Sequence, residues 1–385
     1  MIFLDHAATS PVRREALEAM WPYLTGAFGN PSSRHRLGDE AARALAWARE
    51  EVADVVGVRP GDVVFTSGGT EADNLAVKGL ALGRVATGEQ PRRHVVVSPV
   101  EHEAVLESAD ALARLHGFEV TLVDVDGHGL VHPDALAAAL RPDTALVSIQ
   151  LANNEVGTVQ PIADLAALAH DAGALMHTDA VQAAGWLSVR LDDLGADALS
   201  LAGHKVGAPK GTGALVVRGR FPLEPVVHGG GQERGRRSGT ENVAGAVGFA
   251  TALRLAETER ADASTRVAAL GRAFSDRVLA EVPGAVLTGH PERRLPGTRS
   301  FVFPGTSGEA VLLELERDGV LSSSGSACAA GSDEPSHVLT AMGLDAGLAQ
   351  TAVRFTLGRE TTDEELDAAA TALVRAVEAV RGIRT

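Results

Sequence analysis

The 385-residue chain contains one cysteine, Cys328, so it cannot form an internal disulfide bond. This excludes the small disulfide-stabilised proteins of the cell exterior and indicates a reducing compartment. A lone thiol is either an inert structural residue or a reactive group, and the composition leaves both alternatives open.

Lysine is scarce as well, since only three of the 35 basic residues are lysines, namely Lys78, Lys205 and Lys210. Any chemistry that requires a lysine amine therefore has three candidates. Acidic residues number 50, and the net charge of −15 disfavours a protein that binds the phosphate backbone of nucleic acids. We expect no direct nucleic-acid partner and no metal site.

The sequence also lacks a continuous apolar run of about 18 residues, which a membrane-spanning helix requires. Near the N-terminus, Asp5 and His6 interrupt the apolar core that a signal peptide would need. These absences predict a soluble, cytoplasmic protein without a membrane partner. Hydrophobic residues make up 45% of the chain against 22% charged residues, and the length suffices for two domains with cores of their own.

Between about residues 40 and 220, short β-branched segments alternate with Ala- and Leu-rich helical segments. This alternation is typical of a parallel sheet covered by helices and predicts an α/β fold with a mostly parallel, seven-stranded sheet. The expected helices are 39–56, 103–116, 133–140 and 161–172. The expected strands are 63–65, 95–97, 120–123, 145–149, 174–177, 198–201 and 213–217.

The pattern changes after a helix predicted at 243–260. A further helix follows, then short strands at 285–288, 300–303 and 353–357 with helices at 308–318 and 363–381. This spacing predicts a smaller α+β domain at the C-terminal end. We place the boundary near residue 255, which gives a large domain of residues 1–255 and a small domain of residues 256–385 that carries Cys328.

Polar residues directly follow five of the predicted strands. Ligands bind beyond the carboxyl ends of parallel strands, so we expect these residues to face one crevice. The first group, 66–71, opens a helix whose N–H groups and dipole favour a phosphate. Each group alone fits an ordinary helix cap or core residue, whereas their joint placement favours a site. The other groups are 101–102, 153–155, 179–182 and 203–205.

A phosphate cradle, a carboxylate and a lysine are together what pyridoxal 5′-phosphate requires. Its aldehyde bonds to a lysine amine, and its ring nitrogen stays protonated beside a carboxylate. Asp179 is the expected carboxylate. Lys205 is the expected lysine because it follows a strand, whereas Lys78 lies inside a predicted helix and Lys210 in a Pro-Lys-Gly turn.

The single cysteine lies in an unusual segment, 321–335, which consists of small residues without an apolar period. A structural cysteine normally has large apolar neighbours. The composition around Cys328 therefore favours an exposed loop and a thiol that reacts.

These residues carry a resemblance that extends over nearly the whole chain. The sequence resembles the cysteine desulfurases of the NifS/IscS type, in the class V aminotransferase superfamily of fold-type I pyridoxal-phosphate enzymes. The matching motifs are LDHAAT (4–9), NPSS with a histidine (30–35), SGGTE (67–71), EH (101–102), NNEVG (153–157), DAVQ (179–182), GHK (203–205), PKG (209–211), GGGQER (229–234), RSGT (237–240), the segment around Cys328 and RFTLGR (354–359).

The resemblance implies how the cofactor is held. Lys205 would bond to it covalently, Asp179 would pair with the ring nitrogen, Gln182 would hydrogen-bond the ring hydroxyl, and His102 would stack on the ring and assist proton transfer. Asn154 would contact both cofactor and substrate. The phosphate contacts would come from Gly69, Thr70 and His204, and from Thr240 of the partner subunit in a homodimer.

The resemblance also implies a reaction and its remaining residues. Arg354 and Asn154 would hold the carboxylate of L-cysteine, since an arginine fork binds a carboxylate through two parallel hydrogen bonds. Cys328 would accept the sulfur as a persulfide, leaving L-alanine. The small C-terminal domain would carry that cysteine in a loop, and the first 14 or so residues of the chain would pack against this domain.

One position departs from the family pattern. Relatives often carry a serine, whose hydroxyl contacts the phosphate, where this chain has Ala202, so one expected hydrogen bond to the phosphate is lost.

Two further points stay open. Another class V enzyme, such as a selenocysteine lyase or an aminotransferase, would not need Cys328. The sulfur acceptor would be a partner protein, either an iron–sulfur scaffold or a thiolation enzyme that modifies nucleic acid.

Overall fold

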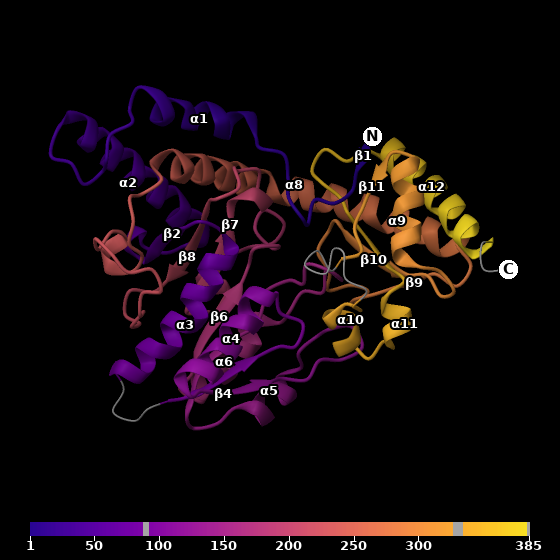
Figure 1. The fold of residues 1–385 in the computed structure, drawn as a ribbon, viewed down its shortest axis with the longest axis horizontal. Helices are drawn as coiled ribbons and strands as arrows, with labels where there is room; N and C mark the ends of the chain where they lie inside the picture. The colour runs from indigo at the N-terminus through magenta and orange to yellow at the C-terminus, as the bar shows by residue number, and fades with distance from the viewer. Residues whose placement is uncertain (88–91, 326–333, 383–385) are drawn as a thin grey trace.

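A seven-stranded sheet forms the centre of the larger part of the molecule, on the left in Figure 1. The computed structural model describes residues 1–87, 92–325 and 334–382. Strands β7, β6, β5, β3 and β4 run parallel, whereas β8 is antiparallel to both of its neighbours. The predicted mostly parallel sheet is thus confirmed. In spatial order, its strands are β2 (Val63–Thr66), β8 (Gly213–Val217), β7 (Ala198–Ala202), β6 (Leu175–Asp179), β5 (Thr144–Ser148), β3 (His94–Val97) and β4 (Glu119–Leu122).

Helices cover both faces of this sheet, as the continuous apolar strands require. Val95 and Val97 pack with α3 and α4 on one face, while Val96 points into the core on the opposite face. This alternation along one strand leaves both sides of the sheet dry. The helices of this part are α1 (Arg14–Thr25), α2 (Arg36–Val56), α3 (Gly69–Thr87), α4 (Glu103–His116), α5 (Pro133–Ala139), α6 (Ile162–Asp171) and α7 (Leu191–Leu194).

A second unit, on the right in Figure 1, has its own core around Phe274, Phe301 and Phe355. Its antiparallel sheet has the order β12-β10-β9, and a separate parallel pair joins β1 to β11. The N-terminal strand β1 therefore packs in the unit that the C-terminal part of the chain forms. The elements are β1 (Ile2–Phe3), β9 (Val286–Leu287), β10 (Thr298–Val302), α9 (Gly308–Arg317), β11 (Val320–Leu321), α10 (His337–Ala341), α11 (Ala346–Ala349), β12 (Ala352–Thr356) and α12 (Asp363–Gly382).

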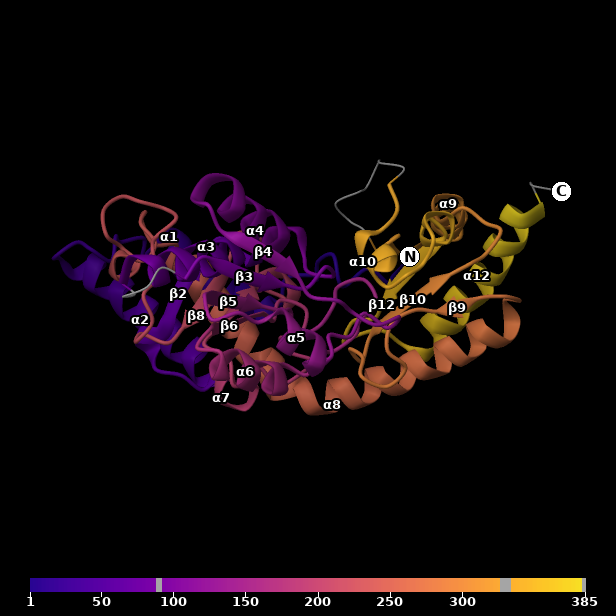
Figure 2. The same cartoon turned by 90° about the horizontal axis from the view of Figure 1, so that it is seen from below.

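One long helix, α8 (Val243–Glu281), connects the two units, and Figure 2 shows it running beneath both. The sequence predicts a helix that ends near residue 260 and a new one beyond it, but the structure has a single helix without an interruption. Ala256 belongs to the core of the large sheet and Val267 to that of the second unit. The buried face thus changes partner along the helix, which disguises its continuity in the sequence. The predicted boundary near residue 255 falls inside α8, and the division into domains stays a prediction.

None of the helices in the described ranges combines the length and the apolar character needed to cross a membrane.

Candidate active site

Lys205 lies in a short 3₁₀ turn, Gly203–Lys205, that directly follows β7. Its Nζ donates a hydrogen bond to the carbonyl of Ala8 at 2.9 Å and another to the carbonyl of Ala7. Burial lowers the pKa of Lys205 to about 8, and repulsion by Arg354 acts in the same direction. A lowered pKa raises the fraction of neutral, nucleophilic amine, which a lysine that attacks an aldehyde requires.

Asp179 is the last residue of β6, the strand next to β7, and only 8% of its surface is exposed. One carboxylate oxygen, Oδ1, accepts a hydrogen bond from the N–H of Val181 at 2.8 Å. Burial raises the pKa of Asp179, whereas this hydrogen bond and the charges of His102 and Lys205 oppose the shift. The carboxylate is therefore buried at the end of the strand with two basic side chains facing it.

His102 caps the N-terminus of α4, where its Nδ1 accepts a hydrogen bond from the N–H of Ala104 at 3.0 Å. A nitrogen that accepts carries no proton, so this contact assigns the proton of the neutral ring to Nε2. The cap fixes the ring orientation from one edge and leaves Nε2 free to contact a ligand.

The segment between β1 and α1, residues 5–10, lies against Lys205, and we call it the N-terminal strap. Gln182 donates from Nε2 to the carbonyl of Ala7 at 3.0 Å, and Ser10 donates from Oγ to the carbonyl of His204 at 2.7 Å. From the other side, Thr356 of β12 accepts the N–H of Ala7 at its Oγ1, at 2.8 Å. The strap therefore joins the second unit to the turn that carries Lys205.

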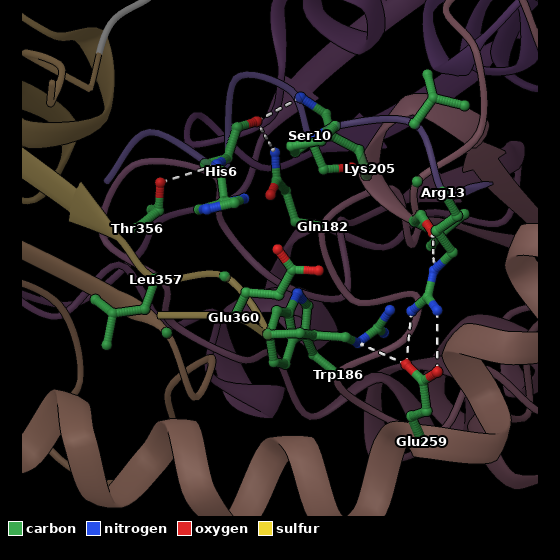
Figure 3. A pocket seen from close by; sticks show the side chains of 18 of the residues that line it. His6, Ser10, Arg13, Gln182, Trp186, Lys205, Glu259, Thr356, Leu357 and Glu360 are labelled. Atoms are coloured by element: carbon green, nitrogen blue, oxygen red, sulfur yellow. Dashed lines mark hydrogen bonds and ion pairs between the residues drawn. The ribbon is translucent and has the colours of Figure 1, made fainter. Parts of the chain in front are cut away.

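Figure 3 shows Lys205 and Gln182 at the edge of a cavity of about 520 Å³ beside the strap. Trp186 and the ion pair between Arg13 and Glu259 line it further, at an N···O distance of 2.7 Å. We call this hollow the strap cavity. Of the predicted site residues, it contains Lys205 and Gln182 but not Asp179, His102 or Arg354.

The start of α3 provides the predicted phosphate cradle. The first N–H groups of a helix have no partner within the helix, and they carry the positive end of its dipole. Gly69 begins α3, and a Cβ atom placed on it would lie 2.8 Å from Cγ2 of Val181 and 3.5 Å from Cβ of Ala202. Only glycine lets the helix start approach the loop that follows Asp179. Thr70, the next residue, is exposed.

Two further residues predicted at the phosphate occupy different settings. His204 contacts Oγ1 of Thr9 through Nδ1 at 3.3 Å, and burial, together with the charges of Lys205 and Lys210, lowers its pKa to about 4. It is therefore a neutral ring at physiological pH. Thr240 is exposed and lines a second cavity with Ser67 and neighbouring residues.

Arg354 lies on β12, only 1% exposed, and reaches across from the second unit. Its Nη1 donates to the carbonyls of Asn154 at 2.8 Å and Gly325 at 3.1 Å, and its Nη2 donates to Oδ1 of Asp5 at 2.7 Å. Nε has no partner among the described residues. Because a guanidinium has five N–H groups, Nε and one N–H of Nη2 remain for a ligand, and a carboxylate bound through two oxygens needs two donors.

Cys328 lies outside the described residues, so its predicted place in the site stays a prediction. The described residues on either side of 326–333 both contact the site. Gly325 holds Arg354, while beyond the gap Ser336 donates to Oε2 of Glu155 at 2.5 Å, and Nε2 of His337 lies 3.0 Å from the carbonyl of Glu101. The described residues nearest to Cys328 in the sequence, Gly325 and Ser336–His337, therefore contact Arg354, Glu155 and Glu101.

Two buried acids lie close to Asp179, and the sequence predicts only one of them, Glu101, among the polar groups at the strand ends, whereas Asp73 is not among these groups. Glu101 accepts from Oγ of Ser98 at 2.6 Å and from the N–H of Gln150 at 3.0 Å, and burial raises its pKa to about 8. Asp73 is 1% exposed on α3. The burial of Asp73 could be predicted from the sequence, because Asp73 lies on the same helix face as the apolar residues Ala76 and Leu80, which points to the sheet.

The comparisons with known proteins agree with this geometry. Residues 2–369 match the family model described as aminotransferase class-V. The cysteine desulfurase IscS of Dictyoglomus turgidum is 44% identical, over 99% of this chain and 96% of that protein. An IscS-like cysteine desulfurase of Mycobacterium tuberculosis is 45% identical, over 99% and 97%. A solved NifS-like protein superposes with a TM-score of 0.90 at 36% identity, covering 98% of this chain and 99% of that one.

The chain belongs to the class V aminotransferase family of pyridoxal-phosphate enzymes and, within it, to the cysteine desulfurases. The relatives favour this reading over a selenocysteine lyase or an aminotransferase. Its cofactor is pyridoxal 5′-phosphate, and the residues present fit that group. Gly69 lets the N-terminus of α3 lie against the loop that follows Asp179, a buried carboxylate ends the neighbouring strand, and the adjacent lysine has a lowered pKa.

Proposed function

We propose that this enzyme converts L-cysteine to L-alanine and passes the sulfur to Cys328 as a persulfide. One observation carries the proposal. Asp179 ends β6, Lys205 follows the neighbouring strand β7, and Arg354, with two donors left over, is close enough to Lys205 to lower its pKa. This combination suits an amino acid whose α-amino group reacts while its carboxylate is held.

The cofactor would be held at three places. Lys205 would bond to its aldehyde, Asp179 would keep its ring nitrogen protonated, and Gly69, Thr70 and His204 would contact its phosphate. The neutral ring of His204 supports this role, since it donates an N–H without requiring a buried charge. Gln182, which lies three residues after the end of β6, would contact the ring hydroxyl.

The side chains of this enzyme then divide the reaction among them. When bound, pyridoxal 5′-phosphate supplies an electron-withdrawing ring that acidifies the substrate Cα–H bond. Lys205 would move the proton at Cα, and His102, with its proton on Nε2, would assist the proton transfer. Arg354 and Asn154 hold the substrate carboxylate and so orient the Cβ–S bond.

Sulfur transfer is a displacement at the substrate sulfur. The thiolate of Cys328 attacks that sulfur, a new S–S bond forms, and the Cβ–S bond breaks with its electron pair going to the substrate carbon. That carbon takes a proton and becomes the methyl group of L-alanine. The net change is L-cysteine plus enzyme thiol to L-alanine plus enzyme persulfide, with no external oxidant.

A homodimer would complete the phosphate site, with Thr240 contributed by the partner subunit. Exposure supports this proposal, because Thr70 and Thr240 both lie on the surface of the single chain.

A stripe of apolar side chains on α1, which we call the α1 stripe, is also exposed: Leu17 at 51%, Trp21 at 66% and Leu24 at 60%. These residues are spaced four and three apart and so lie on one helix face.

The persulfide would leave by transfer to an acceptor protein, either an iron–sulfur scaffold or a thiolation enzyme. On either side of Cys328 in the sequence, Gly325 accepts from Arg354 and Ser336 donates to Glu155. These contacts support a route in which Cys328 receives the sulfur and then delivers it. As proposed from the sequence, the enzyme would act in the cytoplasm.

The experiment that tests the function is the Cys328→Ser variant. L-Alanine formation from L-cysteine should fall by about 100-fold or more, because a hydroxyl does not attack the substrate sulfur. The variant should keep the visible absorbance of the bound cofactor, which shows that the fold is intact. Substantial residual alanine and sulfide production with full cofactor content would contradict the persulfide mechanism.

A further inference from the structure

A buried polar cluster lies behind Asp179, on the face of the large sheet that α3 covers. His177 lies two residues before Asp179 on β6, so both side chains point to this face. Its Nδ1 lies 2.8 Å from Oγ of Ser148 on β5, and its Nε2 lies 3.0 Å from Oγ of Ser200 on β7. The same face is otherwise filled by valine, leucine and alanine. Polar groups at this depth require partners and therefore a specific arrangement.

Asp73 of α3 completes this cluster from above. It lies about one helical turn after Gly69, is 1% exposed, and faces Ser200, whose hydroxyl acts to lower its pKa. Its Oδ1 lies 3.9 Å from Nε2 of His177 and has no partner within the described ranges. This contact is no ion pair, because burial lowers the pKa of His177 to about 3 and the ring is neutral.

The direction of the hydrogen bonds depends on whether Asp73 carries a proton. A neutral Asp73 donates to Ser200, Ser200 donates to Nε2 of His177, and Nδ1–H donates to Ser148. An ionised Asp73 reverses every bond in this chain. An ionised carboxylate would also leave its unpartnered Oδ1 charged in an apolar layer, which costs far more than an unpaired carbonyl oxygen. The geometry favours the neutral acid.

The surrounding charges favour the same state. The acids that face Asp73 are Asp179 and Glu101, whereas the charges that act on Asp179 to lower its pKa are those of His102 and Lys205. Burial and both neighbouring acids raise the pKa of Asp73 well above its usual value. Two carboxyl groups in one buried cluster do not both ionise cheaply, and Asp179 is the one with cations beside it.

We propose that Asp73 is a positioning residue for the cofactor ring: as a neutral acid, it orients the Ser200–His177–Ser148 chain and leaves Asp179 as the one anionic carboxylate behind the ring nitrogen. The inference rests on the proposed role of Asp179. It assigns a function to a buried acid that neither binds substrate nor touches the reacting atoms.

Infrared spectroscopy of the cofactor-free protein tests the protonation state directly. At pH 7, the difference between wild type and Asp73→Asn should contain the carbonyl stretch of a protonated carboxylic acid. Asp134→Asn is the matched control, because Asp134 is exposed and should lose carboxylate bands only. A difference spectrum of Asp73→Asn that shows carboxylate bands alone would overturn the proposal. This outcome does not depend on whether the enzyme acts on L-cysteine.

Cofactor affinity tests the positioning role. Asp73→Asn, which is always neutral and hydrogen-bonds like the acid, should bind pyridoxal 5′-phosphate within about threefold of wild type. Asp73→Leu, similar in size but without hydrogen bonds, should bind about tenfold more weakly, the effect of one lost neutral hydrogen bond. Rescue by asparagine separates positioning from filling of space. Equal affinity of the leucine variant and wild type, or equal weakening by both substitutions, would refute the role.

Discussion

At the scale of single residues, the site depends on groups whose ionisation is set by burial. Lys205 is the clearest case, since burial lowers its pKa to about 8 while the carbonyls of Ala7 and Ala8 hold its Nζ. The carbonyls fix the position of the amine, and the lowered pKa makes it reactive near neutral pH. Both properties come from the N-terminal strap and the end of β7, elements that are distant in the sequence.

This environment predicts the pH dependence of cofactor attachment. With a pKa of about 8, about one Lys205 in a hundred is neutral at pH 6 and about half at pH 8. The rate at which cofactor-free enzyme binds pyridoxal 5′-phosphate covalently should therefore rise with pH and level off above about pH 8. Stopped-flow absorbance measures this rate. Nα-acetyl-lysine is the control, because its free side-chain amine has an ordinary pKa. An enzyme rate that keeps rising above pH 9, as the rate of the control does, would contradict the assignment.

At the scale of elements, the start of α3 is the part of the site with the tightest packing requirement. Gly69 faces Val181 of the loop after β6, and a Cβ at this position would lie 2.8 Å from the valine methyl group. Helix and loop must then move apart. The helix start is the proposed phosphate cradle, and the loop follows Asp179, which is proposed to contact the ring nitrogen. An added methyl group at Gly69 would therefore change the distance between the two parts of the cofactor site.

Gly69→Ala should therefore weaken binding of pyridoxal 5′-phosphate by about tenfold, an effect typical of misplacing one or two hydrogen-bond donors. The affinity is measured by titrating cofactor-free protein and following absorbance. Gly61→Ala is the matched control, because a Cβ at Gly61 meets no atom within 4 Å. Unchanged affinity in Gly69→Ala would show that the phosphate does not bind at this helix start.

The sequence predicts the elements of the large sheet well because their signals are local. The strands there are four or five residues long, and most of them are buried apolar runs. The convergence of the polar residues that follow these strands on one site stays a prediction. The continuity of α8 was missed, because its buried face changes core between Ala256 and Val267. The contacts of Asp73 and of the strap were missed because they join elements far apart in the chain, and no local pattern encodes such pairings.

At the scale of the whole molecule, the single chain presents surface that a soluble monomer would normally cover. The α1 stripe exposes three large apolar side chains, and Thr240, proposed to contact phosphate in a partner subunit, is exposed as well. Contiguous apolar surface of this kind is typical of protein–protein contacts. We expect the stripe to be buried in the homodimer.

Trp21→Asp should therefore shift the protein from dimer to monomer in sedimentation velocity and weaken cofactor binding at the same time, because the partner's Thr240 is lost. Leu115→Asp is the control: Leu115 is 69% exposed on α4, and its substitution should change neither property. A Trp21→Asp protein that stays dimeric would exclude the α1 stripe from the interface.

The N-terminal strap also bears on how the enzyme is made. The strap supplies the carbonyls that hold Lys205, yet β1 pairs with β11 and Ala7 donates to Thr356, near the end of the chain. During synthesis, the strap and β1 precede their partners β11 and Thr356 by more than 300 residues. A nascent chain can therefore form the large sheet before the strap finds its partners in the second unit.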